Sequence, residues 1–203
     1  MPPVTEIILA SHSPRRRALL KQLGVPFRVV PPRHDEQRRP GEAAAAYAVR
    51  NARAKARSVL RRVATGAGGP RRRLIVLGAD TLVVRAGRVM EKPRGAGQAR
   101  AMLRALSGRR HQVITGLCFL VSRPPAPPVA RVLTVRTDVS FRALRAAEVA
   151  AYVATGEPLD KAGAYAIQGG AAHMVREIRG SYTNVVGLPL AEVAEMLRAL
   201  RGQ

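Results

Sequence analysis

Apolar residues follow two periods along the chain, and these periods indicate which segments form strands and which form helices. Nearly continuous apolar runs at residues 6–10 and 74–84 predict buried strands. Two further apolar runs, at 111–122 and 129–141, predict an antiparallel strand pair, and the proline-rich residues 123–128 between them predict a connecting loop. The chain is therefore expected to contain a sheet with at least one hairpin.

Helices are expected where apolar residues recur every three or four positions. The segment after Pro14 places Leu19, Leu20 and Leu23 on one helical face and ends at Gly24, a residue type that often terminates helices. Further helices are expected over residues 41–63, 96–106 and 146–154, and from Pro189 with Val193, Leu197 and Leu200 facing inward. The mixture of strands and helices predicts an α/β fold with a mixed β-sheet.

Length and composition set the scale of this fold. A chain of 203 residues suits a single domain over residues 1–203, built as two lobes around a cleft. Hydrophobic residues make up 47% of the chain, so a core can form, but aromatic residues are only 3%. The core must therefore consist mainly of Ala, Val, Leu and Ile. The glycine-rich residues 65–70 predict a loop after the longest helix.

The charge of the chain is unusual. It has 35 Lys and Arg against 13 Asp and Glu, a net charge of +22. Such a field attracts polyanions, but the arginines lie in small scattered clusters, without a basic tail, a recognition-helix pattern or zinc-finger spacing. The scarcity of aromatic residues leaves little for bases to stack upon. We therefore do not expect nucleic-acid binding as the main function, and we attribute the arginines to a compositional bias.

Cysteine usage and hydropathy predict where the protein works. The one cysteine, Cys118, lies in an apolar run, cannot form an internal disulfide, and is expected to be buried. No apolar stretch approaches the ~18 residues that span a membrane. The N-terminus also lacks the pattern of a signal peptide. These features predict a cytoplasmic protein with no membrane contact.

The junction between the first strand and the first helix reads Ser-His-Ser-Pro-Arg-Arg-Arg, at residues 11–17. Ser13 is a favourable N-cap and Pro14 a favourable first helical residue. The three arginines, however, add positive charge where a helix already carries partial positive charge. A bound anion would reverse that cost, because free amides, the hydroxyls of Ser11 and Ser13, and the guanidinium groups form a phosphate cradle. The alternative is that the arginines are simply solvated.

Asp80 is an isolated carboxylate within the apolar residues 77–83. Burying a carboxylate is costly unless it is paired or binds a cation, so this residue is a candidate for catalysis or metal binding. Gly78 beside it would allow another backbone or a ligand to approach closely. The alternative is a capping or salt-bridged Asp at the end of a strand.

Other polar residues stand out against this composition. Asp35 and Glu36 are adjacent acids in a chain poor in acids, although a solvated loop would explain them equally simply. Lys92 and Lys161 are two of only four lysines, and a Lys retained where Arg is the usual cation suggests a site that needs a compact ammonium group. Gln168 is expected to follow an apolar strand, where its amide could face a base edge or simply satisfy the strand end.

These residue types together fit a hydrolase that uses a divalent metal. Hard cations prefer carboxylate oxygens, and Mg²⁺ in particular keeps several waters while it bridges to substrate phosphates. The four histidines lack zinc-ligand spacing, and the chain contains neither a Walker loop nor a GxGxxG motif. The residues alone therefore predict metal-assisted hydrolysis of a phosphorylated small molecule.

Five short motifs lie along nearly the whole chain: LASHSPRR at 9–16, GADT at 78–81, EKP at 91–93, LSG at 106–108 and GSYTNVVGLP at 180–189. Together, in this order, they resemble the Maf family of nucleoside triphosphate pyrophosphatases. The resemblance implies a two-lobed α/β fold with a mixed sheet around a central cleft, related to the inosine triphosphate pyrophosphatases, and a homodimer. Residues 160–169 are similar to the subgroup that acts on dTTP and UTP.

The resemblance also implies a reaction and roles for individual residues. Water would attack the α-phosphorus of dTTP or UTP and release the monophosphate and pyrophosphate, with Mg²⁺ or Mn²⁺ as cofactor. Asp80 matches the residue assigned as proton acceptor. Polar residues around the phosphates and the metal match Ser11, Arg15, Arg16, Glu36, Lys55 and Lys92. Positions linked to base selection match Arg15, Thr81 and Gln168.

Two alternatives to this function stay open at the level of sequence. One is hydrolysis of 7-methyl-GTP, the activity of another subgroup of the family. The other is a regulator of septum formation and division that acts by binding a partner or nucleic acid through the arginine-rich surface. The regulatory role could coexist with nucleotide hydrolysis in the same protein.

Overall fold

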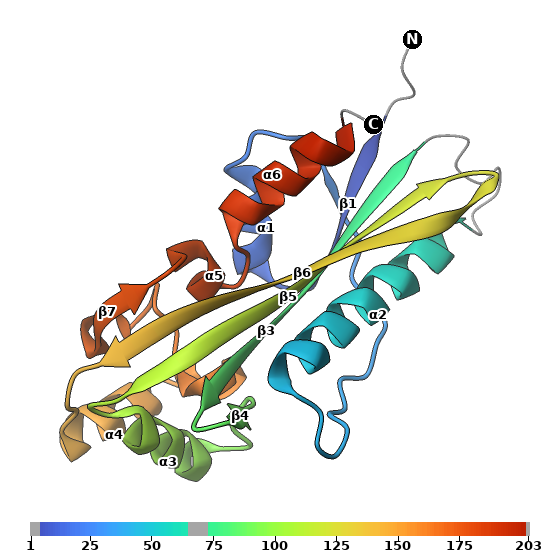
Figure 1. Cartoon of the computed structure of the whole chain (residues 1–203). Helices are drawn as coiled ribbons and strands as arrows, with labels where there is room; N and C mark the ends of the chain where they lie inside the picture. The colour runs from blue at the N-terminus through green and yellow to red at the C-terminus, as the bar shows by residue number, and fades with distance from the viewer. Residues whose placement is uncertain (1–4, 65–72, 202–203) are drawn as a thin grey trace. The chain divides into compact units, whose positions relative to one another are not determined.

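The computed structural model describes residues 5–64 and 73–201, which form a mixed sheet with helices packed against it (Figure 1). The chain divides into two compact units. The first consists of Met1–Asp80, Thr115–Val135 and Gly187–Gln203, and the second of Thr81–Ile114 and Arg136–Val186. The single domain expected over residues 1–203 stays a prediction.

The sheet contains seven strands among the described residues, in the order β2-β1-β3-β5-β6-β7, with β4 paired to β3. Their bounds are β1 Glu6–Ala10, β2 Arg28–Val29, β3 Leu74–Arg85, β4 Arg88–Met90, β5 Arg110–Arg123, β6 Ala126–Phe141 and β7 Val175–Arg179. β1 is parallel to both β2 and β3, whereas β4 is antiparallel to β3 and β7 is antiparallel to β6. The expected α/β fold with a mixed sheet is confirmed.

Six α-helices are present in the described ranges: α1 Pro14–Lys21, α2 Ala44–Ala64, α3 Ala96–Leu106, α4 Ala146–Ala154, α5 Tyr182–Val186 and α6 Leu190–Arg201. Short 3-10 helices lie at Glu157–Asp160, Ala162–Ala164 and Ala172–Met174. Within residues 5–64 and 73–201, no helix combines the length and the apolar character that crossing a bilayer requires.

In the first unit, α2 lies on one side of the strands and α1 with α6 on the other (Figure 1). Beneath α2 is a core of small and aliphatic side chains, including Ile8, Ala52 and Val76. Two glycines let α2 come close. A Cβ at Gly78 would lie 2.1 Å from the carbonyl oxygen of Ala52, and a Cβ at Gly116 would lie 2.4 Å from the carbonyl carbon of Ala48. The close approach expected at Gly78 is therefore made by the backbone of α2.

The structure corrects two details of the expected elements. The loop expected over residues 123–128 is only a two-residue turn, because β5 runs to Arg123 and β6 begins at Ala126. Prolines 127 and 128 lie in the exposed first residues of β6, the part of a strand where a missing N–H is tolerated. The long helix begins at Ala44 rather than at Gly41, whose φ of +69° is not helical. The loop expected at residues 65–70 lies outside the described residues.

Candidate active site

The start of α1 has the capped geometry that its sequence predicts. The Ser13 hydroxyl accepts a hydrogen bond from the backbone N–H of Arg16 at 3.3 Å, and Pro14 is the first helical residue. The buried Ser11 hydroxyl accepts one from the N–H of Ser13 at 3.0 Å. The first turn holds no acidic residue. Two hydroxyls thus lie at the positive end of a helix whose first turn contains three arginines.

The three arginines differ in their surroundings. Arg17 is exposed, whereas Arg15 and Arg16 are half-buried. The Nε of Arg16 donates to the carbonyl of Gly187 at 2.8 Å, which fixes the guanidinium group. Burial lowers the pKa of Arg16, while the charges of Asp80 and Glu36 oppose that shift. Arg16 therefore lies within the field of the two carboxylates that were predicted to bind metal.

Asp80 lies within β3 and is buried, with 4% of its surface exposed. Its Oδ1 accepts a hydrogen bond from Lys55 Nζ at 2.6 Å, and its Oδ2 accepts one from Asn51 Nδ2 at 3.0 Å. Both donors come from α2, one helical turn apart. Asp80 is thus salt-bridged, but it is not at a strand end, because β3 continues to Arg85.

Glu36 reaches the same group from a segment without regular secondary structure. Its Oε1 lies 2.6 Å from Lys55 Nζ, so one ammonium group bridges the carboxylates of Glu36 and Asp80. The neighbouring acid, Asp35, is exposed and accepts a hydrogen bond from Gln37 at 3.0 Å. Of the two adjacent acids, Glu36 therefore belongs to the group around Lys55 and Asp35 does not.

Two residues next to this group, Asn51 and His34, were not anticipated as site residues from the sequence. Asn51 is fully buried, and its Oδ1 lies 3.4 Å from Nε2 of His34. Asn51 could have been found by projecting α2 as a helix. Its spacing from Lys55 places it on the buried face, where Tyr47, Ala48 and Ala52 are also buried.

The donor set at this point fits a hard divalent cation. Two carboxylates converge on one cationic group, the Lys55 ammonium. Within residues 5–64 and 73–201 there is no cluster of three or more His, Cys, Asp or Glu side chains that could form a complete cage. A pair of carboxylates suits Mg²⁺, which keeps several waters and takes further oxygen ligands from substrate phosphates.

The other predicted site residues belong to the second unit. Thr81 follows Asp80 on β3 and is half-buried, and Lys92 is exposed just beyond β4. Lys161 pairs with the carboxylate of Asp160. The N–H of Gly163 donates to the carbonyl of Glu91 at 3.3 Å, which holds the segments of Lys161 and Lys92 side by side.

The prediction of a strand directly before Gln168 is wrong. A short 3-10 helix covers Ala162–Ala164, the next two residues have no regular secondary structure, and Gln168 is exposed in a turn. Gly163 and Ala164 both have positive φ, at 68° and 60°, which prevents an extended backbone. A Cβ at Gly163 would lie 2.8 Å from the side chain of Val83, so close packing on β3 explains the glycine there.

A buried tyrosine and a carboxylate, neither noticed in the sequence, hold the turn that carries Gln168. The Tyr152 hydroxyl accepts from the N–H of Ala166 at 3.1 Å and donates to Glu157 Oε1 at 3.1 Å. Glu157 Oε2 in turn accepts from the N–H of Gly170 at 3.0 Å. Burial, followed by the charge of Glu157, raises the pKa of Tyr152, so the hydroxyl stays protonated as a donor.

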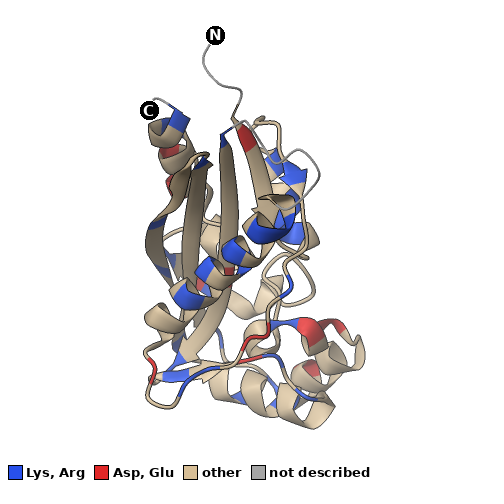
Figure 2. Cartoon of the chain, turned by 90° about the vertical axis from the view of Figure 1, so that its right-hand side faces the viewer, with Lys and Arg blue, Asp and Glu red and all other residues tan. Residues whose placement is uncertain are grey.

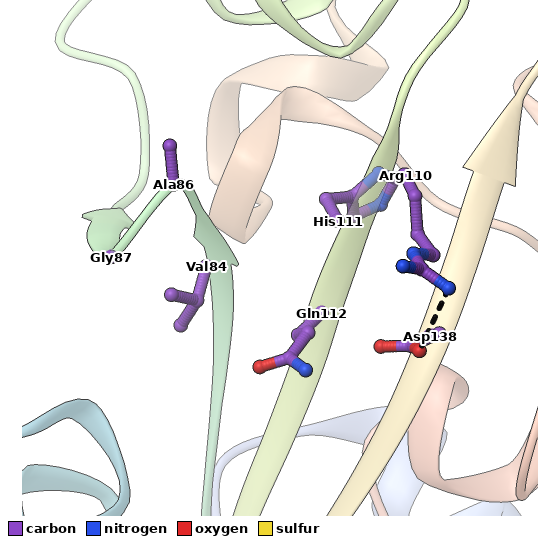
Figure 3. A pocket seen from close by; sticks show the side chains of 7 residues that line it. All are labelled: Val84, Ala86, Gly87, Arg110, His111, Gln112 and Asp138. Carbon is purple, nitrogen blue, oxygen red and sulfur yellow. Dashed lines mark ion pairs between the residues drawn. The ribbon is translucent and has the colours of Figure 1, made fainter.

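The second unit also contains a shallow pocket of about 250 Å³ (Figure 3). It is lined by Val84, Ala86, Gly87, Arg110, His111, Gln112 and Asp138. Arg110 pairs with Asp138 across it at 3.8 Å. Burial lowers the pKa of His111 to about 4, so the ring is neutral, and its Nε2 lies 2.9 Å from the hydroxyl of Tyr165. None of the predicted site residues lines this pocket.

Cys118 is buried in the core beneath α2, as expected. Burial raises the pKa of its thiol to about 11, so the reactive thiolate is not populated at neutral pH. The cysteine therefore has a packing role.

Comparisons with known proteins give one consistent set of relatives. The family model described as Maf-like protein matches residues 6–200. A dTTP/UTP pyrophosphatase of Anaeromyxobacter dehalogenans (strain 2CP-C) is 52% identical over 192 residues, covering 95% of this chain and 92% of that protein. A protein of the same name from Escherichia coli O157:H7 is 50% identical over 194 residues, covering 96% and 92%.

Solved structures resemble the chain more distantly. The dITP/XTP pyrophosphatase from Mycobacterium abscessus is 15% identical with a TM-score of 0.44, covering 98% of this chain and 97% of that one. A HAM1 protein from Coxiella burnetii is 17% identical with a TM-score of 0.47, covering 97% of this chain and 100% of that one.

Proposed function

The chain belongs to the Maf family, and we propose that it hydrolyses dTTP and UTP, each to the nucleoside monophosphate and pyrophosphate. Relatives about 50% identical over nearly the full length carry the name of this activity. One structural observation supports it most strongly. Within a single compact unit, Arg16 at the start of α1 lies in the field of Asp80 and Glu36, the two carboxylates that share Lys55.

The start of α1 supplies the binding site for the triphosphate. Helix amides, the hydroxyls of Ser11 and Ser13, and the guanidinium groups of Arg15 and Arg16 all donate to oxygen. Three arginines in a first turn without any acid are unfavourable alone, and a bound anion makes them favourable. The substrate therefore explains a charge arrangement that the fold does not require.

A divalent cation, Mg²⁺ or Mn²⁺, would be held by Glu36 and Asp80, with the phosphates as further ligands. When bound, such an ion supplies neutralisation of the charge that develops on the phosphoryl oxygens. Lys55 Nζ lies 2.6 Å from an oxygen of each carboxylate and so neutralises their charge until substrate arrives. It then contributes a second positive charge beside the reacting phosphate.

Asp80 is the proton acceptor for the attacking water. The water oxygen bonds to the α-phosphorus and its proton passes to Asp80, while the bond from the α-phosphorus to the bridging oxygen breaks. Pyrophosphate leaves with the electron pair of that bond. Asp80 is buried, and hydrogen bonds from Lys55 and Asn51 hold its carboxylate in place for this role.

Recognition groups are proposed in each unit. Lys92 and Lys161, in the second unit, supply compact ammonium groups for phosphate. Arg15, in the first unit, and Thr81 and Gln168, in the second, select the base. The hydrogen bonds of Tyr152 and Glu157 support the turn of Gln168 at a fixed place within this unit. We also propose that the protein forms a homodimer and that it works in the cytoplasm.

A substrate panel with detection of released pyrophosphate tests this function. With Mg²⁺ or Mn²⁺, the purified protein is expected to release pyrophosphate fastest from UTP and dTTP. Hydrolysis of UTP in ¹⁸O-labelled water is expected to place the label in UMP, because water attacks the α-phosphorus. Faster hydrolysis of 7-methyl-GTP, or label found in the pyrophosphate, would contradict the proposal.

A further inference from the structure

Asn51 is a fully buried amide on the face of α2 that meets Asp80. We propose that Asn51 is a positioning residue for Asp80 and is itself held in place by His34. The inference rests on the proposed function, because it concerns the orientation of the proposed proton acceptor. Asn51 touches neither the start of α1 nor the carboxylate of Glu36 in any hydrogen bond described above.

The chemistry of the neighbours fixes which way the amide points. An ionised carboxylate can only accept hydrogen bonds, so the Asn51 group 3.0 Å from Asp80 Oδ2 must be the NH₂. The carbonyl oxygen of Asn51 then faces Nε2 of His34 at 3.4 Å. A carbonyl can only accept, so the His34 tautomer that completes this contact carries its proton on Nε2. The three side chains form a relay with one consistent direction, from His34 to Asn51 to Asp80.

The relay determines which oxygen of Asp80 is available for chemistry. The terminal torsion of an Asp side chain is broad, so a carboxylate without fixed donors rotates easily. Asn51 engages Oδ2 and so stops that rotation, leaving Oδ1 as the oxygen now held by Lys55. Lys55 has a second partner in Glu36 at 2.6 Å and can release Oδ1 without becoming unpaired. Oδ1 is therefore the oxygen that turns to the attacking water.

A purely structural role does not explain an amide at this position. The neighbouring buried positions on the same helical face, Ala48 and Ala52, are apolar. Burying an amide costs free energy unless its hydrogen bonds are made, and an aliphatic side chain would fill the space but leave Oδ2 of the buried Asp80 without this donor. Both hydrogen bonds of Asn51 lead to the site, one to Asp80 and the other to the segment that carries Glu36.

The test is steady-state kinetics of Asn51→Leu with UTP. Leu has the same branched skeleton as Asn, is larger, and donates no hydrogen bond. We expect kcat to fall by roughly 10- to 100-fold, a part of what a general base contributes. The KM for UTP should change by less than about threefold, because the phosphate-binding groups at the start of α1 are untouched.

His34→Leu gives a second, independent variant on a half-buried loop. We expect kcat to fall by about threefold to tenfold with KM unchanged, since the amide of Asn51 loses its anchor. In the double variant, His34→Leu should have no further effect, because it acts through Asn51. Additive losses in kcat would contradict the relay.

Ser58→Ala is the matched control. Ser58 lies on the same helix, accepts from the N–H of Arg33 at 3.2 Å and donates to the carbonyl of Lys55 at 3.0 Å. This variant also loses two hydrogen bonds, one of them between α2 and the loop before Glu36, but none to Asp80. Its kcat should stay within about twofold of the parent. If Ser58→Ala lowers kcat as much as Asn51→Leu does, Asn51 is only a structural tie and the inference is wrong.

The outcomes separate this inference from the proposed function. A parent protein that releases no pyrophosphate from UTP or dTTP overturns the proposed function and the inference with it. A parent that is active, with Asn51→Leu at the same kcat, overturns the inference alone. Should Asn51→Leu fail to fold, as judged by its thermal transition, the His34→Leu variant decides in its place, and an unchanged kcat there is the contradicting result.

Discussion

The surroundings of Arg16 suit its side chain to binding a phosphate group. Its Nε is fixed by the carbonyl of Gly187 at 2.8 Å, and its charge lies in the field of Asp80 and Glu36. A guanidinium group held in this way is already oriented before substrate arrives, so little side-chain entropy is lost on binding. Arg17, one residue later, is exposed and gives the same helix turn a solvated arginine for comparison.

Arg16 and Arg17 provide a matched test of phosphate binding. For Arg16→Gln we expect the KM for UTP to rise by roughly tenfold or more, since a charge-assisted hydrogen bond to phosphate is lost. The Arg17→Gln variant removes the same charge from the same turn, and its KM should stay within about twofold. Equal increases in both variants would mean that only the general field of the arginines matters.

The site residues that could be predicted from the sequence are those whose charge conflicts with their local element. Asp80 and the arginines could be found because each has the wrong polarity for its local element, and that conflict is visible in the sequence. Asn51 and His34 could not be paired in this way, because their contact joins a loop to a helix 17 positions away. Gln168 was assigned to the wrong local structure because the positive φ of Gly163 and Ala164 is not visible in an apolar pattern.

Helix α2 depends on two glycines in the strands beneath it. The Cβ of an alanine at position 78 would lie 2.1 Å from the backbone carbonyl of Ala52, and the backbone cannot easily give way. We therefore expect Gly78→Ala to lower the free energy of unfolding by about 3 kcal/mol or more. Urea unfolding measures this. Gly97→Ala in α3 is the control, since its Cβ meets nothing within 4 Å, and it should be neutral or slightly stabilising.

The start of α4 makes a separate prediction about pH. Hydrogen bonds from the Arg142 side chain and from the N–H of Arg145 lower the pKa of Glu148 from 4.5 to about 2. A carboxyl whose pKa is lower in the folded state stabilises the fold above its unfolded pKa, and that contribution is lost as pH falls toward the folded value. Glu148→Gln should therefore lower the Tm above about pH 5, with the difference from the parent shrinking as pH falls below 4.5. A difference that does not depend on pH would contradict the ionic origin.

Most elements could be predicted because their periodicity is strong. The strand over residues 6–10 and the helices over 96–106 and 146–154 have the bounds that were expected. The strands and the α-helix that were missed are short: β2 has two residues, β4 has three, and β7 and α5 have five each. Such segments hold too few positions for a period to be read, and tertiary pairing rather than local preference determines them.

The molecule as a whole carries a net charge of +22, and α2 shows a row of Lys and Arg along its length (Figure 2). A field of this size attracts a triphosphate from a distance and is screened by salt. We expect the KM for UTP to rise by about threefold or more between about 0.05 M and about 0.5 M NaCl, with kcat nearly constant. Repeating the series with a salt of a different monovalent anion separates screening from competition by chloride.

The division into two units places the predicted residues in two groups. Ser11, Ser13, Arg15, Arg16, Glu36, Lys55 and Asp80 belong to the first unit, and Thr81, Lys92, Lys161 and Gln168 belong to the second. Within the first unit lie the arginine-rich start of α1, a carboxylate pair that shares Lys55, and the Asn51 donor to Asp80. Within the second lie a hydrogen-bonded turn at Gln168 and two lysine segments held side by side.

One measurement tests the role of the first-unit group most directly: the rate of pyrophosphate release from UTP by Asp80→Asn, compared with the parent at saturating UTP and Mg²⁺. Asn keeps the shape of the side chain but cannot accept the proton or hold a cation as a carboxylate does. We expect kcat to fall by at least about 100-fold in a variant that still folds. A rate equal to that of the parent would contradict the assignment of hydrolysis to Asp80.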